Sequence, residues 1–157
     1  MMGNPLRSDT DYELFIYSIV ESFPLAERST LTFVRQGATL ARVAGELYLT
    51  GDHRIVVRER IVYDRLPAEI DWYGYEVWCG SEKLYWYDSQ PHPNEPKLQS
   101  THPHHKHVPP DIKHNRIPAP EMSFAKPNLP VIIAEVEAMI RSQESEDSGE
   151  TDGKNAL

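Results

Sequence analysis

Six of the seven histidines lie between residues 92 and 114, and five of them fall in the segment STHPHHKHVPPDIKHNRIPAP at residues 100–120. Proline removes backbone donors and disfavours a helix, so we expect an extended chain, in which side chains two positions apart share a face. His102 and His104 are then predicted on one face with Lys106 next in line, and His105 and His107 on the other. Imidazoles grouped in this way suit proton transfer near neutral pH or metal binding.

Three roles are compatible with this pairing. Two imidazoles and a lysine around a phosphodiester could cleave RNA without a metal, if one histidine takes the proton of the 2′-OH and another protonates the leaving oxygen. Lys106 or Arg116 would then stabilise the charge on the phosphoryl oxygens. Alternatively, a His-x-His pair with a third ligand could hold zinc, and the candidate ligands are His102, His104, His105 and His107. The third role is a solvated polar loop whose histidines bind backbone groups, and spacing alone does not choose among the three.

Aromatic residues form a second group, because all three tryptophans and four of the eight tyrosines lie in residues 72–87. This pattern is typical of core packing and cross-strand aromatic pairs, and also of a sheet on which unpaired bases stack. Arg58 and Arg60 share one face of a neighbouring predicted strand, where they either pair with acidic residues or follow a phosphate backbone. The RNA-binding interpretation predicts contacts from Trp86, Arg58, Arg60 and Lys113.

The elements that must position these residues follow from hydrophobic spacing. Thr10 and Glu13 fit a capping box for a helix at about 10–22, which Pro24 should end. Residues 28–88 then alternate with period two in five short runs separated by hairpin-length gaps, which predicts an antiparallel meander. Ten of the thirteen prolines fall between 91 and 130, so we expect a long Pro/His-rich loop at 91–127, after which Asn128 caps a last helix.

The predicted fold class is therefore α+β: an N-terminal helix, a twisted five-stranded antiparallel meander, the long loop and a C-terminal helix. Residues 1–141 are expected to form a single domain. The remaining residues, 142–157, are polar, acidic and without aromatic side chains, so we expect a disordered tail. A loop of about forty residues within a compact domain is usually functional or disordered, which directs attention to the histidines again.

Charge and composition limit the function. The net charge of −8 argues against strong nonspecific binding to nucleic acid, although residues 91–128 carry five basic against three acidic side chains. Cys79 is the only cysteine, which excludes an internal disulfide. No apolar run approaches the roughly 20 residues of a membrane span, and the first residues lack a signal-peptide pattern. We expect a cytoplasmic protein that does not enter a membrane.

Two segments resemble the TumE family of toxin–antitoxin toxins. LYWYDSQPHP is followed by STHPHHKHVPPDIK, and Pro103, His104, His105, Lys106 and His107 match the family's Pro-His-His-Lys-His block residue for residue. Tyr87 and Asp88 match the aromatic-Tyr-Asp strand end that precedes this block. The acidic balance departs from the basic composition that is typical of RNase toxins.

The resemblance implies a small cytoplasmic toxin of a type II toxin–antitoxin module that acts as an endoribonuclease on RNA. Its partner would be a cognate antitoxin protein, expected to carry a helix-turn-helix. With the chemistry of the side chains, the resemblance predicts a catalytic set consisting of His104, His105, Lys106, His107, Arg116 and Tyr87. No cofactor is expected for acid–base cleavage, whereas a metal-site protein would hold zinc. A non-catalytic module that binds a ligand or a partner through the aromatic sheet and the loop is a further alternative.

Overall fold

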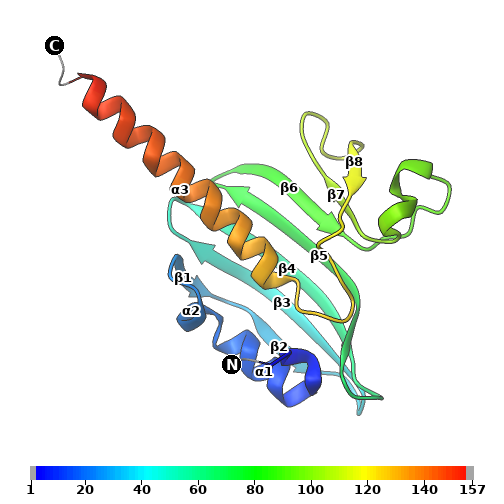
Figure 1. Cartoon of the computed structure of the whole chain (residues 1–157). Helices are drawn as coiled ribbons and strands as arrows, with labels where there is room; N and C mark the ends of the chain where they lie inside the picture. The colour runs from blue at the N-terminus through cyan, green and yellow to red at the C-terminus, as the bar shows by residue number, and fades with distance from the viewer. Residues whose placement is uncertain (1–2, 155–157) are drawn as a thin grey trace.

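The computed structural model describes residues 3–154, with side chains described as far as residue 147. It contains one twisted sheet, with the helices on one of its faces (Figure 1). In chain order the elements are η1 (Pro5–Arg7), α1 (Asp9–Tyr17), α2 (Ile19–Ser22), β1 (Ala26–Ser29), β2 (Thr32–Arg35), β3 (Leu40–Leu49), β4 (His53–Val62), β5 (Glu69–Cys79), β6 (Glu82–Asp88), η2 (Pro96–Thr101), β7 (His105–His107), β8 (Arg116–Pro118) and α3 (Leu129–Lys154).

The sheet is antiparallel throughout and follows chain order over most of its width. Its strand order is β1-β3-β4-β5-β6-β7-β8, and β2 pairs with the other half of the β3 edge that β1 occupies. Tight turns join β3 to β4 and β5 to β6, and Gly51 and Gly80 in these turns have φ values of +70° and +57°. Glycine adopts such a backbone without a Cβ penalty, so the local sequence determines where each hairpin closes.

The α+β class is confirmed, but the predicted count of five strands is wrong, because the sheet has eight. The first predicted run divides into β1 and β2 on either side of Thr30 and Leu31, where the chain passes very close to β3. A Cβ on Gly45 would lie 2.5 Å from the Thr30 carbonyl oxygen. The other two strands, β7 and β8, lie inside the predicted loop and extend the sheet beyond β6.

The predicted first helix is present in two pieces, α1 and α2, which meet at Ser18. Its N-cap is Ser8 rather than Thr10, since the Ser8 hydroxyl accepts a hydrogen bond from the Asp11 N–H at 3.1 Å. Asp9 and Asp11 occupy the first turn, where negative charge is favourable near the positive end of the helix dipole.

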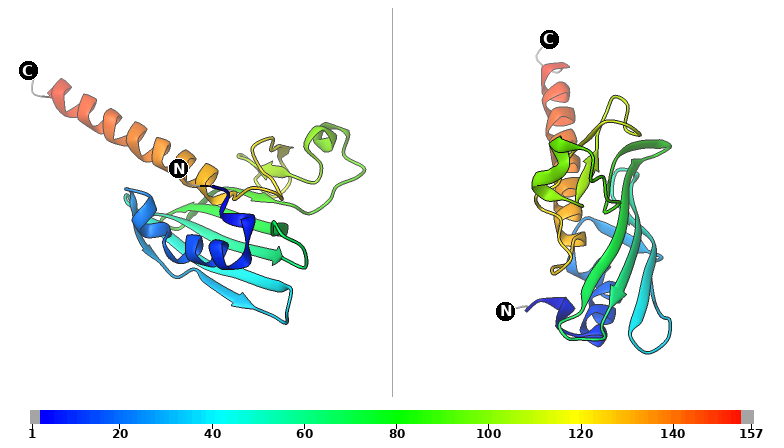
Figure 2. Two further views of the ribbon diagram at one scale, coloured as in Figure 1. Left: turned by 60° about the horizontal axis from the view of Figure 1, so that its bottom comes forward. Right: turned by 90° about the vertical axis from the view of Figure 1, so that its right-hand side faces the viewer.

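The hydrophobic core lies between the sheet and helices α1 and α3, which cover the same face (Figure 2). Tyr73, Tyr75 and Val77 of β5 point into it, as their alternation predicts, while Trp72 and Trp78 lie on the opposite face. The α3 side chains at the predicted three- and four-residue spacing are fully or almost fully buried, and they are Leu129, Ile132, Ile133, Val136 and Ile140.

Helix α3 continues to Lys154, beyond the predicted end of ordered structure at residue 141. The side chains of residues 141–147 are exposed, so apolar contact with the core ends at Ile140. Glutamate and glutamine have good helix propensity, and a helix that is already docked grows by one hydrogen bond for each added residue. Residues 155–157 of the predicted disordered tail lie outside the described residues.

The segment predicted as a long loop runs past the end of β6, forms η2, and returns to the sheet as β7 and β8 (Figure 1). No helix in the described part of the chain is long and apolar enough to cross a membrane.

Candidate functional site

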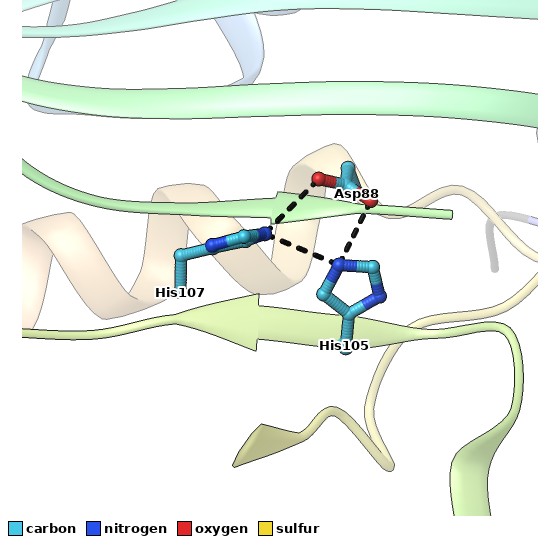
Figure 3. A group of neighbouring side chains, drawn as sticks. All are labelled: Asp88, His105 and His107. Carbon is cyan, nitrogen blue, oxygen red and sulfur yellow. Dashed lines mark hydrogen bonds and ion pairs between the residues drawn. The ribbon is translucent and has the colours of Figure 1, made fainter. Parts of the chain in front are cut away.

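Pairing of β6 with β7 brings a carboxylate against two imidazoles (Figure 3). Asp88 is the register partner of His105, and Trp86 is the register partner of His107. His105 Nε2 lies 2.9 Å from Asp88 Oδ1, and His107 Nε2 lies 3.2 Å from Asp88 Oδ2. The two Nε2 atoms are 3.2 Å apart. We call Asp88, His105 and His107 the His–Asp centre.

The outer ring nitrogens of the His–Asp centre are held by the backbone. His105 Nδ1 lies 3.1 Å from the Pro103 carbonyl oxygen, and His107 Nδ1 lies 2.7 Å from that of Ile112. A carbonyl oxygen only accepts, so each Nδ1 carries a hydrogen. In a neutral pair both Nε2 atoms would then be bare acceptors that face one another and a carboxylate. Atoms placed in this way can share a proton or hold a cation.

The rings are nearly inaccessible, whereas the carboxylate is open on one side. His105 is 1% exposed and His107 4%, while the Asp88 side chain is 24% exposed. The His107 ring stacks on Trp86 with 3.9 Å between centroids, and Trp86 Nε1 donates to Asp88 Oδ2 at 3.0 Å. Asp88 is thus the member of the centre that is most accessible to solvent.

Asp88 is held in its charged form. Burial alone would raise its pKa, but hydrogen bonds from His105 and His107, and from the Gln90 N–H, lower the pKa of this carboxyl far below its ordinary value. A carboxylate with so many donors is a weak base. Its chemical role is to hold and orient imidazoles and to stabilise positive charge on them.

The same three residues could hold a metal ion. One ligand atom from each lies within 4.8 Å of the others, and two histidines with one carboxylate are a common set for divalent transition metals. Metal-binding imidazoles usually donate their second nitrogen to a carbonyl or a carboxylate, as both rings do here. Of the zinc ligands predicted from sequence, only His105 and His107 belong to this group, and Asp88 stands in place of His102 and His104.

His104 lies on the opposite face of the chain from His105, next to the core. Its Nδ1 is 2.6 Å from the Tyr73 hydroxyl, and its ring packs on Tyr73 and Phe124. Burial lowers the pKa of His104, and the nearby His105 and His102 lower it further. His104 is therefore separated from the His–Asp centre by the alternation of the strand.

Lys106 and Tyr87 also face away from the centre, toward α3. Lys106 Nζ lies 3.7 Å from Glu135 Oε2 and 4.3 Å from the centre of the Tyr85 ring. The Tyr87 hydroxyl donates to Glu135 at 2.6 Å. Of the predicted catalytic set, the structure brings His105 and His107 together and places His104, Lys106 and Tyr87 on the other face.

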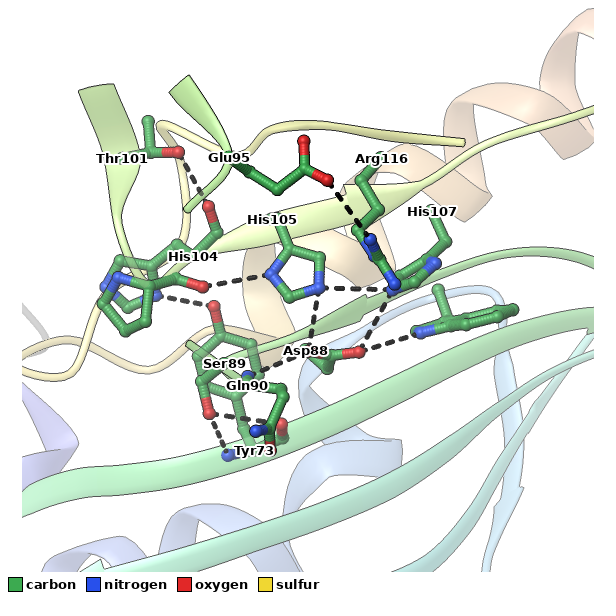
Figure 4. Close-up of polar contacts among 12 residues, drawn as sticks. Tyr73, Asp88, Ser89, Gln90, Glu95, Thr101, His104, His105, His107 and Arg116 are labelled. Carbon is green, nitrogen blue, oxygen red and sulfur yellow. Dashed lines mark hydrogen bonds and ion pairs between the residues drawn. The ribbon is translucent and has the colours of Figure 1, made fainter. Parts of the chain in front are cut away.

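Arg116 lies beside the centre, as its register partner is His107 (Figure 4). Its Nη1 is 3.9 Å from Glu95 Oε1, and its buried Nε has no hydrogen-bond partner among the described residues. The His92 ring meets the His105 ring edge to face at 4.8 Å. Burial lowers the pKa of His92, and the positive charges of Arg116 and His105 add to this effect, while the negative charge of Asp88 opposes it.

Asp88 and His92 were missing from the predicted set of site residues. Asp88 could have been found from the strand end that the family resemblance includes, since the last side chain of a strand lies where the next strand can pair with it. His92 carried only a weak signal, because nine residues separate it from His102, the first of the main histidine group.

The structure also brings only some of the predicted RNA-binding residues together. Trp86 and Arg58 border a cleft of about 310 Å³ on the helix-free face of the sheet, and Asp88 borders it too. Arg60 lies at the same face but forms an ion pair with Asp71 at 2.6 Å. Lys113 is exposed in the turn between β7 and β8 and does not border the cleft.

Comparison with known families gives one finding. The profile of the family described as Toxin TumE matches residues 16–140 of the 157-residue chain. The matched segment contains all eight strands and the His–Asp centre. No curated protein matches the chain. No solved structure matches it either.

Proposed function

Because the chain belongs to the TumE family of toxins, we propose that it is an endoribonuclease toxin whose catalytic groups surround the His–Asp centre. A toxin of this kind has an antitoxin as its partner, and we propose a helix-turn-helix protein in that role and the cytoplasm as the place of action. RNA is the proposed substrate, and the proposed chemistry needs no metal.

The observation that carries the proposal is that three histidines lie close together in environments that affect their protonation differently. The buried His105–His107 pair faces the carboxylate of Asp88, whereas the pKa of the adjacent His92 is lowered by burial and by Arg116. Pairs of titratable groups whose environments differ in this way are typical of acid–base sites.

The proposed reaction uses these groups as follows. His92 takes the proton from a ribose 2′-OH, and the oxygen attacks the adjacent phosphorus. A proton from the His105–His107 pair passes through the carboxylate of Asp88, the accessible member of the centre, to the leaving 5′-oxygen, so that the products are a 2′,3′-cyclic phosphate and a 5′-hydroxyl. The guanidinium of Arg116 stabilises the charge that develops on the phosphoryl oxygens. Asp88 positions the pair at the open edge, where a phosphodiester enters.

The test is RNA cleavage by the purified protein in the presence of EDTA, with the product ends identified. We expect His92→Ala and His107→Ala to lose about 10²–10⁴-fold in rate, and toxicity on expression to fall with it. His114→Ala is the matched control, since His114 is an exposed imidazole of the same segment, with its side chain 69% exposed. A folded wild-type protein that arrests growth but leaves RNA intact would contradict the proposal.

Metal binding is the second candidate function, favoured by the backbone-anchored imidazoles that converge with Asp88. Elemental analysis of tag-free protein distinguishes the two. If EDTA abolishes cleavage and Zn²⁺ restores it, the ion performs the activation that we assign to proton transfer.

A further inference from the structure

One row of residues, contributed by neighbouring strands, runs along the cleft on the helix-free face. Arg58, Gly74, Asp88 and His105 lie in register across β4, β5, β6 and β7. Gly74 is the one position in this row without a side chain, and the cleft opens above it between Arg58 and Asp88. The row leads directly from the cleft to the His–Asp centre.

Two tryptophans flank the row on its two sides. Trp72 precedes Gly74 by two residues on β5, and Trp86 precedes Asp88 by two residues on the antiparallel strand β6, so that they lie on opposite sides of the row. Both border the cleft. Its volume of about 310 Å³ is at the lower end of ordinary small-molecule sites, and its walls are flat aromatic surfaces.

The charged side chains that border the cleft balance one another, with Arg58 and Lys83 against Glu76 and Asp88. Glu76 lies 3.0 Å from Lys83 Nζ and 3.7 Å from Arg58 Nη2, so one carboxylate is shared by two cations. Lys83 also lies over the Trp86 ring, 4.1 Å from its centre. Arg58 is the more accessible cation, with its side chain 60% exposed. A ligand is therefore held mainly by its flat apolar faces, with one cation available for a phosphate.

We propose that this cleft is a subsite for one unpaired nucleotide of the RNA substrate, with its base against Trp72 and Trp86 and its phosphate near Arg58. The inference rests on the proposed function and narrows its substrate class to single-stranded RNA. A base in a duplex is stacked on its neighbours and cannot enter, whereas an unpaired base stacks readily on aromatic side chains. The subsite places the adjoining phosphodiester toward Asp88.

Binding through base stacking needs few positive charges, so it is compatible with the protein's net charge of −8. For single strands, the logarithm of affinity falls with the logarithm of salt concentration by about 0.7 for each phosphate that is neutralised. With Arg58 as the accessible cation of the cleft, we expect a slope near −0.7, far below that of proteins that bind through basic patches.

The experiment measures binding without cleavage. The probe is a short, labelled single-stranded RNA with 2′-O-methyl sugars, which cannot form a cyclic phosphate, and its anisotropy is followed in parallel with tryptophan quenching. Base–aromatic stacking is worth about 1–3 kcal/mol for each base, so Trp72→Ala should weaken binding about 5- to 150-fold. Trp78→Ala is the matched control, because Trp78 lies on the same strand and face but does not border the cleft.

Gly74→Val provides an independent variant that fills the floor. The backbone of Gly74 is not in the positive-φ region, and a Cβ there would meet Arg58 and Trp72 only at 3.8–4.0 Å, so the strand should accept it. We expect this variant to be folded and to lose affinity for the probe.

Three results would overturn the inference: no binding by the wild-type protein, equal losses in Trp72→Ala and Trp78→Ala, or equal affinity for a duplex of the same sequence. Binding that depends on Trp72 and Gly74, in a protein that cleaves no RNA, would support the subsite and contradict the endoribonuclease proposal. The two proposals can therefore fail separately.

Discussion

Glu59 is a buried carboxyl at the junction of α1, β4 and β5, and it should make the stability of the fold depend on pH. It is 2% exposed, and it accepts hydrogen bonds of 2.5 Å from the hydroxyls of Tyr12 and Tyr75. Burial raises its pKa from 4.5 to about 7, although both tyrosine hydrogen bonds act in the opposite direction. Between about pH 4.5 and 7, the folded protein therefore retains a proton on Glu59 that the unfolded chain releases.

The direction and size of this pH effect follow from the difference between the pKa of Glu59 in the folded protein and in the unfolded chain. The stabilising contribution of a raised pKa is fully present below the unfolded value and is lost as the pH rises through the folded value. One pKa unit corresponds to about 1.36 kcal/mol, so the shift of Glu59 amounts to about 3 kcal/mol lost between about pH 4.5 and 7. The contribution of Asp88 has the opposite sign, since its pKa is lowered, but it changes only at more acid pH.

Glu59→Gln isolates this effect. The amide keeps an acceptor for one tyrosine hydroxyl and offers a donor to the other, so the network stays connected. We expect the free energy of unfolding of the wild type, relative to that of Glu59→Gln, to fall by about 3 kcal/mol between pH 5 and 8. Urea unfolding followed by tryptophan fluorescence at several pH values measures this difference.

The control for Glu59→Gln is Glu69→Gln, which removes a carboxyl from an exposed position on β5. It should leave the pH dependence of the wild type unchanged. Parallel stability curves for the wild type and Glu59→Gln would show that Glu59 is ionised in the folded protein throughout this range and would refute the reasoning.

Two further predictions concern stability. Removal of residues 142–157 should leave the melting temperature nearly unchanged, because apolar contact of α3 ends at Ile140 and the side chains of 141–147 are exposed. A loss of several degrees in a thermal scan would show that the end of the helix packs against the rest of the protein. Asn128→Ala should destabilise the protein by about 1–3 kcal/mol, because the Asn128 side chain accepts from the Ser123 N–H at 2.8 Å and donates to the buried Tyr75 hydroxyl at 3.2 Å. Chemical unfolding measures this loss, and an unchanged value would mean that water replaces both contacts.

Much of the architecture could be predicted from the sequence because it depends on local periodicity. The alternation of Tyr73, Tyr75 and Val77 determines which face of β5 is buried, and the three- and four-residue spacing after Asn128 determines the docked face of α3. The sequence did not indicate that part of the Pro/His-rich segment would join the sheet. Three residues of a strand carry little periodic signal, and β7 is stabilised by pairing with β6.

The histidine-rich segment shows where the sequence alone stops being sufficient. Extended alternation placed His105 and His107 on one face and Lys106 on the other, as strand β7 has them. The predicted pairing of His102 with His104 is not tested by this strand, because both residues precede β7 and His102 ends η2. The selection of Asp88 as the partner of the two imidazoles depends on the register between β6 and β7. Hydrogen bonds between strands that are distant along the chain set this register. The residue types are therefore encoded locally, but only the tertiary structure brings the carboxylate to the imidazoles.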